Sequence, residues 1–155
     1  MKRILELSPK TTVILFVFLD VIAAGMGMGV PIFCILFGFP LGWYIATRTI
    51  HSGHYPQSSI PSIILKHAIW SAAFTLLIML VIWGRPIAFL FNPAYDFKNF
   101  GHPFILYDPK MSFIGWLVLM IIISPFLQLL TTVFMAFLVL VKKHDIPTPS
   151  NHQAE

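Results

Sequence analysis

The stretch that decides the fold is VILFVFLDVIAAGMGMGVPIFCILFGFPLGWYIATRTI, which runs from Val13 to Ile50. It is almost entirely apolar and far exceeds the roughly 20 residues that one helical crossing of a bilayer needs. The sequence GMGMGVP near its middle contains residues at which a chain can turn back. The stretch therefore predicts two membrane-spanning helices, at about residues 12–29 and 31–48.

The composition of the whole chain agrees with a membrane protein. Of its 155 residues, 57% are hydrophobic and only 10% are charged, whereas about 25% of the residues in soluble domains are charged. Two further apolar runs predict helices at about residues 62–83 and 111–141. The sequence thus predicts an all-α integral membrane protein, in which residues 1–155 form a single domain built as a bundle of four transmembrane helices.

The basic residues predict the orientation of this bundle. One side would carry Lys2, Arg3, Lys10, Arg48, Lys66, Lys142 and Lys143. The other side would carry Arg85, Lys98 and Lys110. The side with seven basic residues should face the cytoplasm by the positive-inside rule, which places both termini there. We expect the membrane to be the cytoplasmic (plasma) membrane. The charges form no basic stripe, which argues against nucleic acid as a partner.

Two segments are expected to lie outside the helices. An outer loop at residues 84–110 contains seven Phe or Tyr residues and four prolines. Such a loop would lie in the headgroup region, cover the mouth of the bundle or dock against another protein. The polar tail at residues 142–155 is expected to be disordered. Secretory cleavage after the first helix is disfavoured, because Asp20 interrupts the apolar segment that a signal peptide needs.

Asp20 is the acidic residue of the first apolar stretch and the centre of the candidate site. A charged side chain at this depth costs roughly 2.5–3.5 kcal/mol, so it should face other helices and find a partner. Depth along each helix selects the candidates. The predicted polar cluster consists of Asp20, Ser71, Thr75, Gln128 and Thr131, with His67 at its cytoplasmic mouth. The cluster is either a set of interhelical hydrogen bonds or a proton site in which His67 acts as a relay.

Other residues are assigned to packing and to lipid contact. Pairs of glycines four residues apart allow close approach of helices, and these are Gly25, Gly29, Gly38 and Gly42. We expect Trp70 to pack inside the bundle and Pro125 to bend the last helix. Arg48 and Lys66 are expected to contact anionic lipid headgroups. No cofactor or metal site is predicted, because the lone Cys34 and the HxxH of the first polar loop do not supply four ligands.

The sequence contains no nucleophile elbow, phosphate-binding glycine loop or paired carboxylates. The first hypothesis is therefore a protein without catalytic activity that serves as a subunit or accessory of a larger membrane assembly, with membrane lipid and another membrane protein, or itself, as partners. The alternative is a small homo-oligomeric transporter that uses Asp20 as its intramembrane protonation site. A lipid-acting enzyme ranks last, because the polar residues it would need lie on opposite sides of the membrane.

Overall fold

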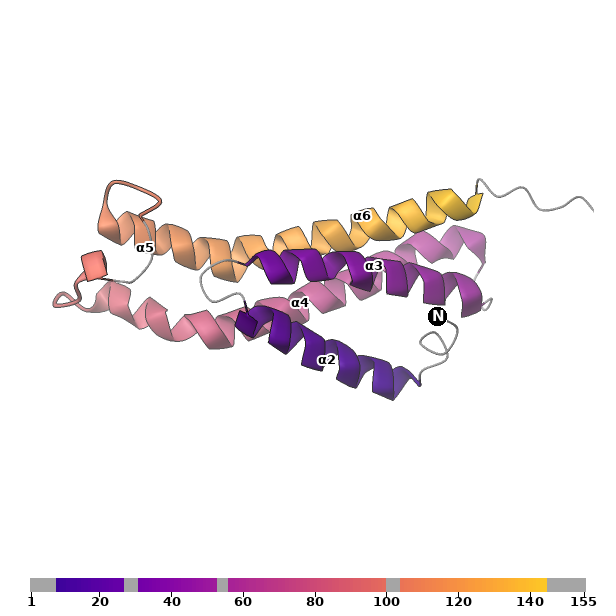
Figure 1. Cartoon of the computed structure of the whole chain (residues 1–155), viewed down its shortest axis with the longest axis horizontal. Helices are drawn as coiled ribbons and strands as arrows, with labels where there is room; N and C mark the ends of the chain where they lie inside the picture. Colours follow the sequence, from indigo (N-terminus) through magenta and orange to yellow (C-terminus); the bar gives the residue numbers. More distant parts are fainter. Residues whose placement is uncertain (1–7, 27–30, 53–55, 100–103, 145–155) are drawn as a thin grey trace, which may run out of the picture.

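A computed structural model describes residues 8–26, 31–52, 56–99 and 104–144 of the chain. Within these ranges the protein is helical and contains no strand. The long helices are α2 (Pro9–Met26), α3 (Ile32–Ser52), α4 (Ile60–Ile87), α5 (Pro109–Val118) and α6 (Ser124–His144). A π-helical turn, η4 (Leu119–Ile123), joins α5 to α6, so that both form one continuous rod (Figure 1). Three short 3-10 segments complete the described elements: η1 (Gln57–Ser59), η2 (Ala88–Phe91) and η3 (Phe97–Asn99).

Three of these helices are long and apolar enough to cross a membrane. They are the segments Ile32–Ser52, Ile60–Phe91 and Pro109–Lys143. The prediction of an all-α protein is therefore confirmed within the described residues, and three of the four predicted crossings have the length and apolar composition that a membrane span needs. The helix limits differ from the expected ones by a few residues: α2 begins at Pro9 instead of residue 12, α4 continues beyond Trp83 to Ile87, and α6 continues to His144. The expected end of the first helix, residues 27–29, lies outside the described residues. The rest of the expected tail, residues 145–155, lies outside the described residues.

α2, α3, α4 and the α5–α6 rod each run antiparallel to the next of these elements along the chain (Figure 1). The start of α2, the end of α3, the start of α4 and the end of α6 lie at one end of the molecule, and the connection from α4 to α5 lies at the opposite end (Figure 1). The contact between α3 and α6 is the most extensive between any two helices, and α2 packs at the periphery. The molecule is therefore organised around the α3–α6 pair.

Two glycines of α3 allow this close approach. A methyl group at Gly38 would overlap the Thr131 side chain and lie 2.6 Å from the Gln128 carbonyl oxygen, and one at Gly42 would overlap the backbone of Thr132. The Thr131 hydroxyl also donates a hydrogen bond of 2.8 Å to the carbonyl of Ile35, in the turn that precedes Pro40. Backbone contact thus holds α3 against α6.

The other two glycines behave differently. Nothing lies within 4 Å of a methyl group built at Gly25, so the close packing expected there is not found. Gly29 lies outside the described residues.

Alanines are buried at several helix contacts, and many large apolar residues face outward, although a few such as Phe113 and Met79 are buried. Ala46, Ala68 and Ala136 are almost completely buried. Trp70 is instead 67% exposed, and the prediction that it packs inside the bundle was wrong. A lipid environment explains this distribution, because large apolar side chains cost nothing on a surface that lipid covers, whereas small residues are needed where helices meet.

The end of the molecule beyond α4 is more ordered than a simple loop. Tyr95 stacks on Phe89 with ring centroids 4.5 Å apart, and Phe97 contacts Tyr95 and Phe113 at 4.9 and 5.2 Å. The Asp108 carboxylate accepts a 2.8 Å hydrogen bond from the Met111 backbone N–H and so caps α5. The expected outer loop 84–110 therefore includes the last turn of α4, two 3-10 segments and an aromatic cluster.

Candidate functional site

The polar residues buried between the helices come from α2, α4 and α6. On α4, Ser71 and Thr75 are one turn apart, and on α6, Ser124 and Gln128 are also one turn apart. This spacing places each pair on one face of its helix. Asp20 of α2 lies between the two faces, and its side chain is completely buried. Three helices thus contribute to one polar cluster.

Asp20 is the acceptor at the centre of this cluster. Its Oδ2 accepts a 2.9 Å hydrogen bond from the Thr75 hydroxyl, and its Oδ1 accepts a 3.2 Å bond from Nε2 of Gln128. Thr75 and Gln128 are completely buried as well. The two carboxyl oxygens therefore connect α2 to α4 and to α6, through residues far apart in the sequence.

Among the described residues, two buried side-chain oxygens of α6 have no hydrogen-bond partner: Ser124 Oγ and Gln128 Oε1. The other hydroxyls bond mainly to their own helices. The Thr75 hydroxyl also lies 3.1 Å from the Ser71 carbonyl, and Ser71 donates to the Ala68 carbonyl at 2.8 Å. Buried polar atoms are nearly always satisfied, so the two unpaired oxygens distinguish this part of α6 from the rest of the buried polar residues.

Thr131 and His67 lie outside this cluster. Thr131 donates to the carbonyls of Ile35 and Gln128, and thereby joins α6 to α3 instead of contacting Asp20. His67 is exposed, and its Nδ1 bonds the Ile63 carbonyl at 2.8 Å. The expectation that His67 forms the mouth of the cluster was wrong, because its position on α4 is rotated away from the buried face.

A second polar contact, which the sequence analysis did not find, joins α2 to α3. One guanidinium nitrogen of Arg48 donates to the Thr12 hydroxyl at 2.6 Å and to the Tyr44 hydroxyl at 2.5 Å. Arg48 was expected to contact lipid headgroups; the structure engages it between helices, whereas Lys66 is exposed. The one-turn spacing of Tyr44 and Arg48 was the signal available, but nothing in it identified Thr12 as the partner.

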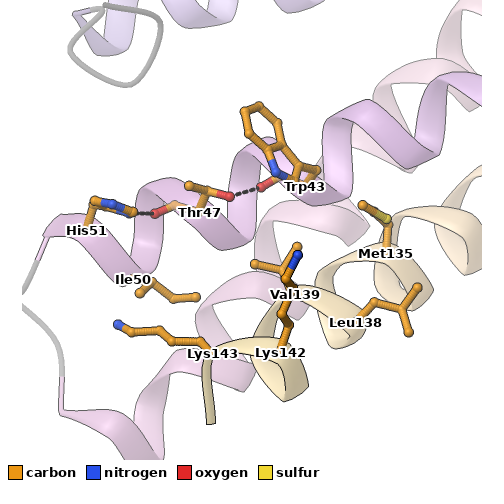
Figure 2. Close-up of a pocket in the computed structure, with 9 residues that line it drawn as sticks. All are labelled: Trp43, Thr47, Ile50, His51, Met135, Leu138, Val139, Lys142 and Lys143. Carbon is orange, nitrogen blue, oxygen red and sulfur yellow. Dashed lines mark hydrogen bonds between the residues drawn. The ribbon is translucent and has the colours of Figure 1, made fainter. Parts of the chain in front are cut away.

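A groove of about 530 Å³ opens between α3 and the end of α6 (Figure 2). It is lined by Trp43, Thr47, Ile50, His51, Met135, Leu138, Val139, Lys142 and Lys143. The walls are mainly apolar, and the two lysines belong to the last turn of α6. The groove is separate from the Asp20 cluster, with which it shares no residue.

Metal binding finds no support in the arrangement of the described residues. Among them, no group of three or more His, Cys, Asp or Glu residues could hold a metal ion. Cys34 is a free, buried thiol. No family model, curated protein or solved structure matches the chain.

Proposed function

We propose that this chain is a multi-pass protein of the cytoplasmic membrane, without catalytic activity, that serves as a subunit or accessory of a larger membrane assembly. In this proposal α2 is a fourth crossing beside the three long apolar segments. Its 18 residues correspond to about 27 Å of helix, close to the roughly 30 Å of a bilayer's hydrocarbon core. The distribution of Lys and Arg supports cytoplasmic termini.

The observation that carries the proposal is the exposed aromatic end of the molecule. The 28 residues of α4 correspond to about 42 Å, whereas the 21 residues of α3 correspond to about 31 Å, and α4 and α5 extend beyond α3 at this end (Figure 1). Phe91 is 82% exposed there, and Tyr107 is fully exposed. Large exposed aromatic side chains on an ordered support are typical of protein-binding surfaces.

The Asp20 cluster supports a structural rather than a catalytic role. Both carboxyl oxygens accept hydrogen bonds from neighbouring helices, and Asp20, Thr75 and Gln128 are shielded from the surroundings. A polar group buried between membrane helices selects which helices pack together, because any other pairing leaves it without a partner. This interpretation requires no substrate.

The alternative is a proton-coupled transporter in which Asp20 takes up and releases the proton. The two unpaired oxygens, Ser124 Oγ and Gln128 Oε1, favour it, because the helix that bonds Asp20 still carries unused hydrogen-bonding capacity. The exposed position of His67 removes the relay that this hypothesis first included. In this case the Asp20→Asn variant should fold but lose pH-driven flux, and undiminished flux would exclude the alternative.

The test of the first proposal is purification of the tagged chain from its native membrane in mild detergent, with mass spectrometry of the accompanying proteins. The Phe91→Ala/Tyr107→Ala double variant should lose a stoichiometric partner. The matched control is Phe18→Ala/Phe137→Ala, which removes two rings that are 62% and 60% exposed on α2 and α6. A partner lost equally from both variants would place the contact elsewhere. Recovery of the wild type without any partner, as a homo-oligomer, would contradict the subunit proposal and favour the transporter.

A further inference from the structure

The lining of the groove between α3 and α6 changes from charged to apolar along its length, as a phospholipid does from its headgroup to its acyl chains. Lys142 and Lys143 lie at its outer end, in the last turn of α6. Met135 and Leu138 lie one to two turns deeper along the same helix, so the lining changes from charged to apolar toward the middle of the bundle. A phospholipid changes in the same direction, from a charged phosphate to apolar acyl chains. The volume of about 530 Å³ lies within the range of small-molecule sites.

The positive charge of the groove is not balanced by the described acidic residues. Asp20 is buried in the polar cluster, and Asp96 and Asp108 lie at the opposite end of the molecule (Figure 1). Lys142 extends from α6 toward α3, across the groove (Figure 2). The two amino groups are therefore positioned to attract an anion.

His51 does not supply this charge when its ring is neutral. Its Nδ1 lies 2.9 Å from the Thr47 carbonyl oxygen, which can only accept a hydrogen bond (Figure 2). The ring must therefore donate through Nδ1, which leaves Nε2 as an acceptor in the neutral form. Lys142 and Lys143 are the two lysines in the lining of the groove, and we assign the attraction for an anion to them.

We propose that this groove binds one anionic phospholipid. The acyl chain lies against Trp43, Met135 and Leu138, and the phosphate contacts the amino groups of Lys142 and Lys143. A free phosphate ion would gain nothing from the apolar walls, whereas a lipid uses both parts of the groove. The inference rests on the proposed membrane placement of this end of the helices, but it does not depend on a partner protein.

The test uses the purified full-length chain in detergent and counts retained lipids by native mass spectrometry. Phosphatidylglycerol is compared with phosphatidylcholine of the same chain length. The Lys142→Gln/Lys143→Gln variant should bind phosphatidylglycerol about 30-fold more weakly, since each lysine near an anionic lipid contributes roughly a fivefold factor. Lys10→Gln/Lys66→Gln removes the same charge at the same end of the bundle, outside the groove, and should change binding less than about twofold.

Two further measurements locate the lipid and keep the result interpretable. Phosphatidylglycerol with brominated acyl chains should quench tryptophan fluorescence in the wild type, and the Trp43→Phe variant should lose that component. The Lys142→Arg/Lys143→Arg variant keeps the positive charge and should keep the binding of phosphatidylglycerol. Retained binding in this variant would show that the glutamine variant loses lipid because it loses charge, and not because substitution at these positions unfolds the protein.

Three outcomes would overturn the proposal. Equal weakening in both glutamine variants would indicate general surface attraction. Equal retention of phosphatidylcholine would indicate an apolar crevice without headgroup recognition. Displacement of the lipid by millimolar inorganic phosphate would indicate a site for a soluble anion instead.

Discussion

Replacing Asp20 and Gln128 together should destabilise the protein by less than the sum of the two single replacements. Nε2 of Gln128 donates to Oδ1 of Asp20, and both side chains are completely buried. Once one of them has been removed, the other has already lost this hydrogen bond, so removing it as well costs less than it does in the wild type. The difference between the sum and the double variant is the coupling free energy of the pair.

The structure predicts how large this coupling is and how it compares with that of a second pair. Hydrogen bonds between membrane helices contribute about 0.6 kcal/mol on average and up to about 1.7 kcal/mol. We expect about 1–1.7 kcal/mol for Asp20 with Gln128, because removal of the carboxyl leaves a buried amide without an acceptor. We expect only about 0.5 kcal/mol for Asp20 with Thr75, because the Thr75 hydroxyl retains the Ser71 carbonyl at 3.1 Å.

The assay is unfolding of the purified protein in mixed micelles by increasing SDS, followed by circular dichroism. The variants are Asp20→Ala, Gln128→Ala, Thr75→Val and the two double combinations. Asp20→Ala with Ser112→Ala serves as the additive control, because Ser112 lies on α5 and bonds the Ile105 N–H. A coupling of Asp20 with Gln128 below about 0.3 kcal/mol, or one smaller than that with Thr75, would refute the assignment of the central hydrogen bonds.

The remaining predictions concern packing, the α2–α3 contact and orientation. In the same SDS titration, Gly38→Ala should lower the unfolding free energy by about 1–3 kcal/mol, because the added methyl group overlaps α6. Gly25→Ala should leave the unfolding free energy unchanged or raise it by up to about 1 kcal/mol, because the added methyl group enters open space. Arg48→Gln should lower the unfolding free energy by about 1 kcal/mol and speed amide hydrogen exchange in the first turns of α2; unchanged exchange would contradict the bridge. In the proposed orientation Tyr107 lies outside the cell and Ser58 lies in the cytoplasm, so a membrane-impermeant maleimide should label the Tyr107→Cys variant in intact cells and the Ser58→Cys variant only after lysis. The native Cys34 is buried and should give little background labelling. The reverse pattern would invert the proposed orientation.

The sequence was sufficient for the membrane class and for the approximate helix limits, because both depend on the length of apolar runs. Depth along the helices also grouped Asp20 with Thr75 and Gln128, which the structure brings into hydrogen-bond contact. The prediction for His67 was wrong about its direction around the axis of α4, not about its depth along the helix. Steps of four residues advance roughly 40° beyond a full turn, so two steps separate His67 from Thr75 by roughly 80° around α4. That rotation carries the histidine to the exposed side.

Other features depend on contacts that a hydrophobic pattern does not encode. Trp70 looked like an interior residue, but in a membrane a large apolar side chain is equally stable on the outside. Gly25 and Gly38 belong to the same spacing pattern, and only the position of α6 distinguishes the packed glycine from the open one. The bond from Arg48 to Thr12 likewise required knowledge of how α2 crosses α3.

The π-helical turn at Leu119–Ile123 fixes how the two halves of the last rod face the rest of the protein. It ends two residues before Pro125, whose missing N–H leaves a turn without its usual hydrogen bond. This wider turn holds one residue more than an ordinary helical turn. If the same residues wound as ordinary α-helix, α5 would rotate relative to α6 by roughly 100°. Phe113 would then leave the aromatic cluster, or Gln128 would leave Asp20. Exchange of one apolar residue for another in this turn should thus be readily inherited. A single-codon deletion in the α-helical residues between the turn and Gln128, where no wider turn can absorb it, should separate the outer end of the protein from its polar centre.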